Sequence, residues 1–211
     1  TMKQTDIINP FQPYMTLEMD GYSQINRTDY GISHFYEFTI HDEKKHCIKA
    51  VPDASIDLLF NIGENKVSTY ISGTVFGVKK WELGTQDDCF GVRFQPGQGI
   101  LPKDITMEMI VNDDIEIDGD IFGKNLTEKI ALAKTMSERI EIFKKAYEDM
   151  VLGRNSLSDK EKINEYLVNR IGRTKGMITM RQLEDETNYS ACYLRRIFKS
   201  FHGISPKQFA Q

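Results

Sequence analysis

The 211-residue chain is 40% hydrophobic and 27% charged, an ordinary globular composition that suits one large domain or two small ones. No apolar run reaches the roughly 20 residues of a membrane-spanning helix, and the first residues lack the basic and apolar regions of a signal peptide. The three separated cysteines, Cys47, Cys89 and Cys192, form neither a disulfide framework nor a paired metal motif. We therefore expect a cytoplasmic protein with reduced thiols, no membrane contact, no cofactor and no resident metal.

Charge is distributed unevenly along the chain, whose net charge is −4. Gly172–Gln211 holds seven Lys or Arg and three acidic residues, a net charge of +4, which leaves −8 for the rest. The net negative charge argues against a protein that coats nucleic acid along its whole surface. A basic module on an acidic body suits a protein that binds DNA at one end.

We predict an α+β protein whose residues 1–124 form a mostly antiparallel β-barrel or sandwich of the cupin-like kind. Apolar and polar residues alternate in strand-like segments separated by short turns: Ser33–His41, Ser55–Ile62, Lys66–Gly73, Thr74–Leu83 and Cys89–Gly97. Asp57 and Arg93 fall opposite the main apolar residues of their strands. These two residues are expected either to pair with each other across the domain or to face a ligand, and the sequence leaves both open.

Residues 125–171 are predicted to be a helical linker segment. Apolar residues recur at helical spacing through Asn125–Gly153 and again through Ser156–Gly172. The stretch Asn125–Gly153 contains two helical pieces. Ser137 is the expected N-cap of the second piece, and Gly153 is its expected end. Ser158, with Glu161 three residues later, has the capping-box pattern at the start of the next helix.

Residues 172–211 are predicted to form a helix-turn-helix. Thr179 is a good N-cap for a first helix over Met180–Thr187, and Asn188 suits a sharp turn because it tolerates left-handed backbone angles. Tyr189 is expected to plug the interior, and Ser190 to cap a second helix. The buried stripe of that helix is expected at i, i+3, i+4 and i+7: Leu194, Ile197, Phe198 and Phe201.

The opposite face of the second helix carries a cluster of polar and basic residues: Cys192, Arg195, Arg196 and Lys199. In a helix-turn-helix the early residues of the second helix enter the major groove, where arginine makes bidentate bonds to guanine. The alternative interpretation is a solvated basic face without a ligand.

Met180–Phe209 resembles the first helix-turn-helix of the AraC/XylS family of bacterial transcription regulators. The shared pattern is a leucine in the first helix, then S-x-x-x-L-x-R-x-F-K (Ser190–Lys199) and G-I-S-P-K-Q-F (Gly203–Phe209). Asn188 replaces the glycine that is common at the turn, which is a physically mild change.

The resemblance implies binding to double-stranded promoter DNA. It places Cys192, Arg195 and Arg196 against base edges, with Ala191 and Tyr193 beside them and Lys199 on a phosphate. It also implies a possible homodimer and a second helix-turn-helix. Since the second motif would begin after Gln211, we expect this chain to be a shortened form with reduced DNA affinity.

"VPDASIDLLFNIG" (Val51–Gly63) and "FGVRFQPG" (Phe90–Gly97) resemble signatures of the β-barrel domain that precedes the helix-turn-helix in one branch of these regulators. The resemblance implies an unknown small-molecule effector, or dimerisation through this domain. The candidate effector-binding residues are Tyr36, Phe38, Asp57, Phe60, Tyr70, Trp81 and Arg93, with Phe94 as a further aromatic. An aromatic stripe is more often plain core.

Two other functions stay open on the sequence. One is a protein-interaction module without an effector. The other, a metal-dependent barrel enzyme, is not favoured, because His41, His46 and Cys47 lack a known ligand spacing and no nucleophile or phosphate-loop motif occurs.

Overall fold

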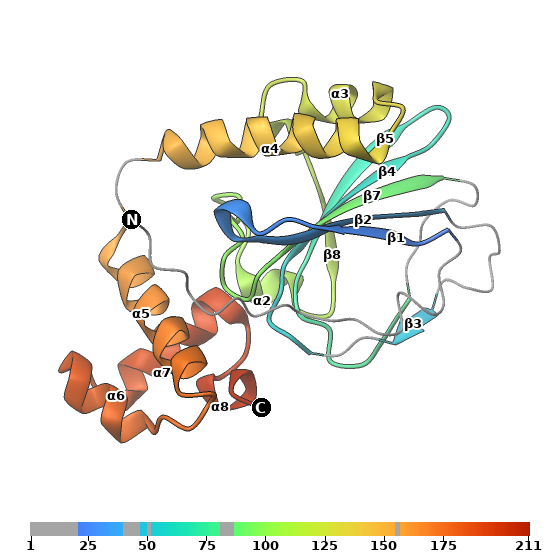
Figure 1. Cartoon of the computed structure of the whole chain (residues 1–211). Helices are drawn as coiled ribbons and strands as arrows, with labels where there is room; N and C mark the ends of the chain where they lie inside the picture. The colour runs from blue at the N-terminus through green and yellow to red at the C-terminus, as the bar shows by residue number, and fades with distance from the viewer. Residues whose placement is uncertain (1–20, 40–46, 50–51, 81–86, 155–156) are drawn as a thin grey trace.

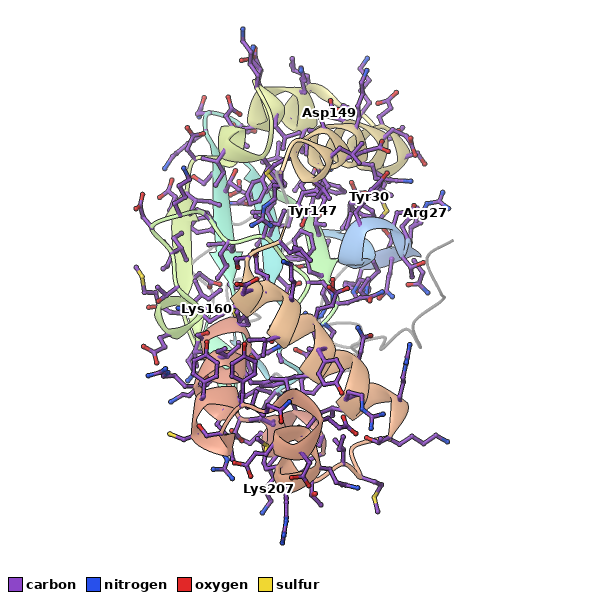
Figure 2. All side chains as sticks on the ribbon, turned by 90° about the vertical axis from the view of Figure 1, so that its left-hand side faces the viewer. Arg27, Tyr30, Tyr147, Asp149, Lys160 and Lys207 are labelled. Carbon is purple, nitrogen blue, oxygen red and sulfur yellow. The ribbon has the colours of Figure 1, made fainter. Side chains whose placement is uncertain are left out.

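The computed structural model describes residues 21–39, 47–49, 52–80, 87–154 and 157–211. The chain folds as an α+β protein, with an antiparallel sheet first and a helical region after it (Figure 1). Helices α3 and α4 cover one face of the sheet, and α5 to α8 gather at one end of it, beside α2. In Figure 2, Lys160 marks α5 and Lys207 marks α8. The helical unit lies at the bottom of that view, and α3 and α4 lie at the top.

The main sheet has six strands in the order β1-β2-β7-β4-β5-β8, and all neighbours are antiparallel. In chain order these strands are β1 (Ser23–Asn26), β2 (Ile32–Thr39), β4 (Asp57–Ile62), β5 (Val67–Ser72), β7 (Asp88–Phe94) and β8 (Asp114–Ile117). Two short strands, β3 (Cys47–Lys49) and β6 (Val78–Lys80), pair with each other and with no other described strand. A short 3-10 helix (Asp29–Gly31) joins β1 to β2.

The prediction of a β-barrel is wrong for the described part of the chain, where the sheet is open. Its edges, β1 and β8, pair with β2 and β5 respectively and not with each other. The predicted strand over residues 74–83 is reduced, among described residues, to the three residues of β6, which leave the main sheet. Closure needs every strand to have two neighbours, and no described strand bridges the edges.

One face of the sheet packs against α3 (Leu126–Leu132) and α4 (Met136–Leu152). The rings of Phe35 and Phe60 both contact Phe90 on the sheet and Phe143 on the helix. Tyr147 of α4 points down toward the sheet (Figure 2) and packs on Phe94 with ring centroids 5.2 Å apart. This aromatic layer is the main hydrophobic core.

Helix boundaries follow local capping chemistry. Helix α4 begins after Thr135 rather than after the predicted Ser137. The Thr135 side chain accepts a hydrogen bond from the amide of Glu138, and the Glu138 side chain accepts one from the amide of Thr135. The predictions of Gly153 as the end of α4 and of Ser158 as the cap of α5 (Asp159–Arg173) are confirmed. None of the helices in the described ranges is long and apolar enough to span a bilayer.

Candidate nucleic-acid interface

Helices α5, α6 (Met180–Thr187) and α7 (Ala191–His202) pack around a second, separate hydrophobic core. Its fully buried members are Leu167, Ile171, Leu183, Leu194 and Phe198. Helix α8 (Pro206–Phe209) closes the unit through Phe209, whose ring meets Phe198 edge-on at 5.2 Å. The predicted bounds of α6 and the predicted burial of Leu183, Leu194, Ile197 and Phe198 are confirmed.

The turn between α6 and α7 is tight because Asn188 adopts φ 57° and ψ 20°, in the left-handed region. This confirms the prediction for Asn188. The Ser190 side chain then accepts a hydrogen bond from the amide of Tyr193, and Glu184 of α6 accepts one from the amide of Ala191. The free amides at the start of α7 are therefore partly satisfied by α6, which fixes the angle between the two helices.

Helix α6 is also tied to α5 by an exposed cluster. Glu186 accepts hydrogen bonds from the Arg170 guanidinium and, at 2.6 Å, from the Tyr166 hydroxyl. The hydrogen bonds from Arg170 and Tyr166 lower the pKa of Glu186 to about 2. Because the cluster is exposed, it orients α6 more than it stabilises the fold.

The outward face of α7 carries the predicted polar stripe. Cys192, Arg195, Arg196 and Lys199 are exposed, while Ala191 and Tyr193 are half-buried. The Arg196 guanidinium lies over the Tyr193 ring, 5.4 Å from its centroid, and Tyr189 packs on the same ring at 5.1 Å. The stack gives Arg196 a defined position on the surface.

Two predictions about this helix are wrong. Tyr189 is no interior plug: it is 43% exposed, because it packs on Tyr193 along the outside of α7. Phe201 is only half-buried, because it lies beyond the three-helix core and faces a cavity beside α2 (Met107–Ile110).

The C-terminal end of α7 packs against the sheet domain through His202, which sequence reasoning did not single out. His202 is fully buried, and its Nε2 lies 2.8 Å from the Asn164 side-chain oxygen. Its ring lies on Gly97, in the turn that follows β7, where a Cβ atom would be 2.0 Å from the His202 ring. Gly203 follows with φ 69° and lies against Val111. The α7 helix is thus fixed to the sheet domain at one end.

This burial predicts a pH-dependent stability. Desolvation lowers the pKa of His202 to about 3, whereas a histidine in the unfolded chain titrates near 6.5. The unfolded state therefore binds more protons below pH 6.5, and the free energy of unfolding should fall as the pH falls. We expect His202 to account for a loss of about 2 kcal/mol between pH 7 and pH 5, measured by urea unfolding.

His202→Gln is the matched variant for this prediction, because glutamine does not titrate and can still bond to Asn164. Its unfolding free energy should decline less over the same pH interval. His34, whose pKa burial and Arg93 lower to about 4, contributes in the same direction and should stay unchanged in this variant. An identical pH profile for the variant and the parent chain would contradict the assignment to His202.

The structure brings together most of the predicted effector-binding residues. Tyr36, Phe38, Asp57 and Arg93 share the face of the sheet opposite α4, with Tyr70 partly buried beside them. Phe60 and Phe94 lie on the other face, in the main core. Trp81 lies outside the described residues.

The centre of that face is a buried ion cluster. Arg93 binds Asp57, at 2.7 Å, and Asp53 through its two terminal nitrogens, and Tyr36 donates a 3.2 Å hydrogen bond to Asp57. Burial by itself lowers the pKa of Arg93, but Asp57 and Asp53 outweigh it and raise that pKa above its ordinary value. The Asp57–Arg93 ion pair, one of the two open alternatives, is therefore present.

Sequence reasoning missed Asp53, the second carboxylate of the cluster. Ala54 has φ 57°, and the Asp53 side chain accepts a hydrogen bond from the amide of Ser55 at 3.1 Å. This turn places Asp53 next to Arg93. The two aspartates four residues apart in "PDASID" were the available signal. Among the described residues, no group of three His, Cys, Asp or Glu side chains is arranged to hold a metal ion.

Comparison with known proteins adds one match, and it falls on the sheet domain. Residues 30–116 match the model of a domain of unknown function, DUF6597. The matched segment runs from the start of β2 into β8 and contains the whole Arg93 cluster, but it stops before α5 to α8. No curated protein and no solved structure matches the chain.

Proposed function

We propose that this protein is a DNA-binding transcription regulator of the AraC/XylS type, in which α6 and α7 form a helix-turn-helix and α7 enters the major groove. The observation that carries the proposal is the exposed stripe on α7. It places two arginines and a lysine on one face of a helix whose opposite face is buried and whose start is fixed by Asn188 and Ser190.

Each residue of the stripe has a chemistry suited to DNA. Arg195 and Arg196 have the planar donor forks that read guanine edges, and the Tyr193 stack orders Arg196 before contact. Lys199, one turn later, suits a phosphate oxygen. Half-buried Ala191 and Tyr193 and exposed Cys192 complete the face.

The sheet domain is proposed to be the regulatory part. The His202–Gly97 contact joins it to α7 directly, so a ligand or dimer partner that shifts the sheet domain can change how α7 is presented. The buried Arg93 cluster is then a structural centre of the regulatory domain, and the aromatic residues around it are the candidates for effector contact.

The test is selection of a preferred sequence from random double-stranded DNA, followed by binding titrations on that site and on a scrambled site. Arg196→Ala should lose discrimination between the two sites by roughly 5- to 150-fold, the loss of about 1–3 kcal/mol expected for one bidentate base contact. Lys199→Ala should weaken both sites equally and reduce the salt dependence by about one phosphate contact.

Lys160→Ala is the control, since Lys160 is exposed on α5 and does not belong to the stripe on α7. It should bind both sites like the parent chain. The proposal fails if the chain selects no sequence and binds no DNA at low salt. If Arg196→Ala behaves like Lys160→Ala, the assignment of Arg196 to base reading is wrong.

A further inference from the structure

A cavity of about 500 Å³ lies between α7 and the sheet domain. The sheet domain contributes a largely apolar wall from the residue before β4, from the segment between β7 and α2, and from the first residue of α2: Ile56, Ile100, Leu101, Ile105 and Met107. Phe201 of α7 continues this wall from the other side. The volume falls within the range of about 300–1,000 Å³ that small-molecule sites occupy.

The polar part of the cavity holds three cations and two carboxylates. Arg154, Arg196 and Lys199 line it, together with the carboxylates of Glu108 and Glu161. Arg154 is paired with Glu161 at 2.9 Å. Neither Arg196 nor Lys199 forms an ion pair with any carboxylate in the part of the chain that the structure describes. The cavity therefore combines an apolar wall with two cations that lack an anion.

We propose that this cavity binds an amphipathic organic anion, a carboxylate or phosphate monoester on an apolar body, with its charge on Arg196 and Lys199. A neutral ligand would leave the two cations unused, and a nucleic-acid phosphate alone would leave the apolar wall exposed. An ionised head and an apolar body together use both halves of the cavity.

The same geometry makes ligand and DNA competitors. Arg196 and Lys199 belong both to the cavity lining and to the stripe assigned to DNA. An anion bound there occupies the donors that would contact a base edge and a phosphate. This competition rests on the proposed DNA-binding function, whereas binding of the anion does not.

Three probes with one apolar body test the anion site: naphthaleneacetate, naphthyl phosphate and the neutral naphthaleneethanol. Titration of the intact chain, followed by naphthalene fluorescence, should show one site that binds at least one anion ten-fold or more tighter than the alcohol. The tighter anion identifies the ligand as a carboxylate or a phosphate monoester. Equal binding of the alcohol and both anions would overturn the proposal.

Variants locate the site. Arg196→Gln and Lys199→Gln should each remove most of the preference for the anions and leave binding of the alcohol unchanged. Arg195→Gln is the matched control: Arg195 is exposed on the same helix but does not line the cavity, so anion binding should stay as in the parent chain. If Arg195→Gln weakens the anions as much as Arg196→Gln does, the probes bind the open basic surface and the proposal is wrong.

Competition is measured separately. The preferred anion should weaken DNA binding by the parent chain in proportion to its occupancy. Thr106→Trp, a substitution at an exposed position of the cavity lining, should exclude the probe and leave a DNA affinity that no longer responds to it. DNA binding that is insensitive to a saturating anion would overturn the competition. A chain that binds no DNA would remove the proposed function, while the fluorescence titration would still decide the anion site.

Discussion

Replacing Arg93 with methionine should lower the free energy of unfolding by about 3–5 kcal/mol, the largest single effect we expect in the sheet domain. The substitution leaves the carboxylates of Asp53 and Asp57, the latter bonded to the Tyr36 hydroxyl, without their common cation. Removing the cation that balances two largely buried carboxylates is costly, because water solvates them poorly and their mutual repulsion is no longer offset. Urea unfolding followed by tryptophan fluorescence or circular dichroism measures the loss.

Arg139→Met is the matched control, since Arg139 is also a buried arginine but pairs with the single, more exposed carboxylate of Glu37 at 2.8 Å. The free energy of unfolding should fall clearly less in Arg139→Met than in Arg93→Met. Neutralising the aspartates in the Arg93→Met chain, as Asp53→Asn and Asp57→Asn, should recover part of the stability, because the repulsion is gone. An Arg93→Met chain as stable as the parent would contradict the ion-cluster assignment.

Gly97→Ala should be the second most damaging substitution, with an expected loss of about 2–4 kcal/mol. Gly97 has φ 74°, which disfavours any side chain, and its Cβ would lie 2.0 Å from the His202 ring. The ring must then move, and it would lose its hydrogen bond to Asn164. Denaturant unfolding gives the stability loss, and the ring-nitrogen NMR signals of His202 report whether the contact persists.

Gly21→Ala separates backbone strain from crowding, because Gly21 has φ 64° and no atom of the described residues lies within 4 Å of a Cβ there. Its loss should be about 1–2 kcal/mol, the cost of the left-handed backbone alone. The additional stability loss of Gly97→Ala over Gly21→Ala is then the cost of displacing His202. Equal losses in the two variants would mean that His202 does not pack on Gly97 as described.

The contact between Gly97 and His202 also holds the cavity together. A chain whose α7 is detached from the sheet domain should also lose the cavity, whose two walls come from those two parts. Anion binding by Gly97→Ala should therefore weaken even at temperatures where the variant stays folded.

Local features were predictable because they depend on a few neighbouring residues. The caps at Ser158, Thr179 and Ser190 and the left-handed turn at Asn188 follow from side-chain chemistry within one helical turn. The shift of the α4 start to Thr135 has the same cause: two hydroxyl residues compete there, and the threonine has Glu138 at the capping-box spacing.

The glycines and the arginine of "FGVRFQPG" show what sequence could not supply. Gly91 is needed because the Tyr36 ring lies over it, and Gly97 because the His202 ring does. Arg93 is needed by Asp53 and Asp57. Each partner lies at least 30 residues away in the chain, so no local pattern could name it.

The sequence by itself determined the α+β order of elements, the alternation that puts Asp57 and Arg93 on one face, and the basic stripe of α7. These follow from periods of two and 3.6 residues and need no knowledge of partners. Only the tertiary structure decided that the sheet stays open, that Phe60 turns away from Tyr36, and that Arg196 and Lys199 border a cavity. Those outcomes depend on which strands pair and how α7 packs on the sheet domain, and both are set by contacts between residues far apart in the chain.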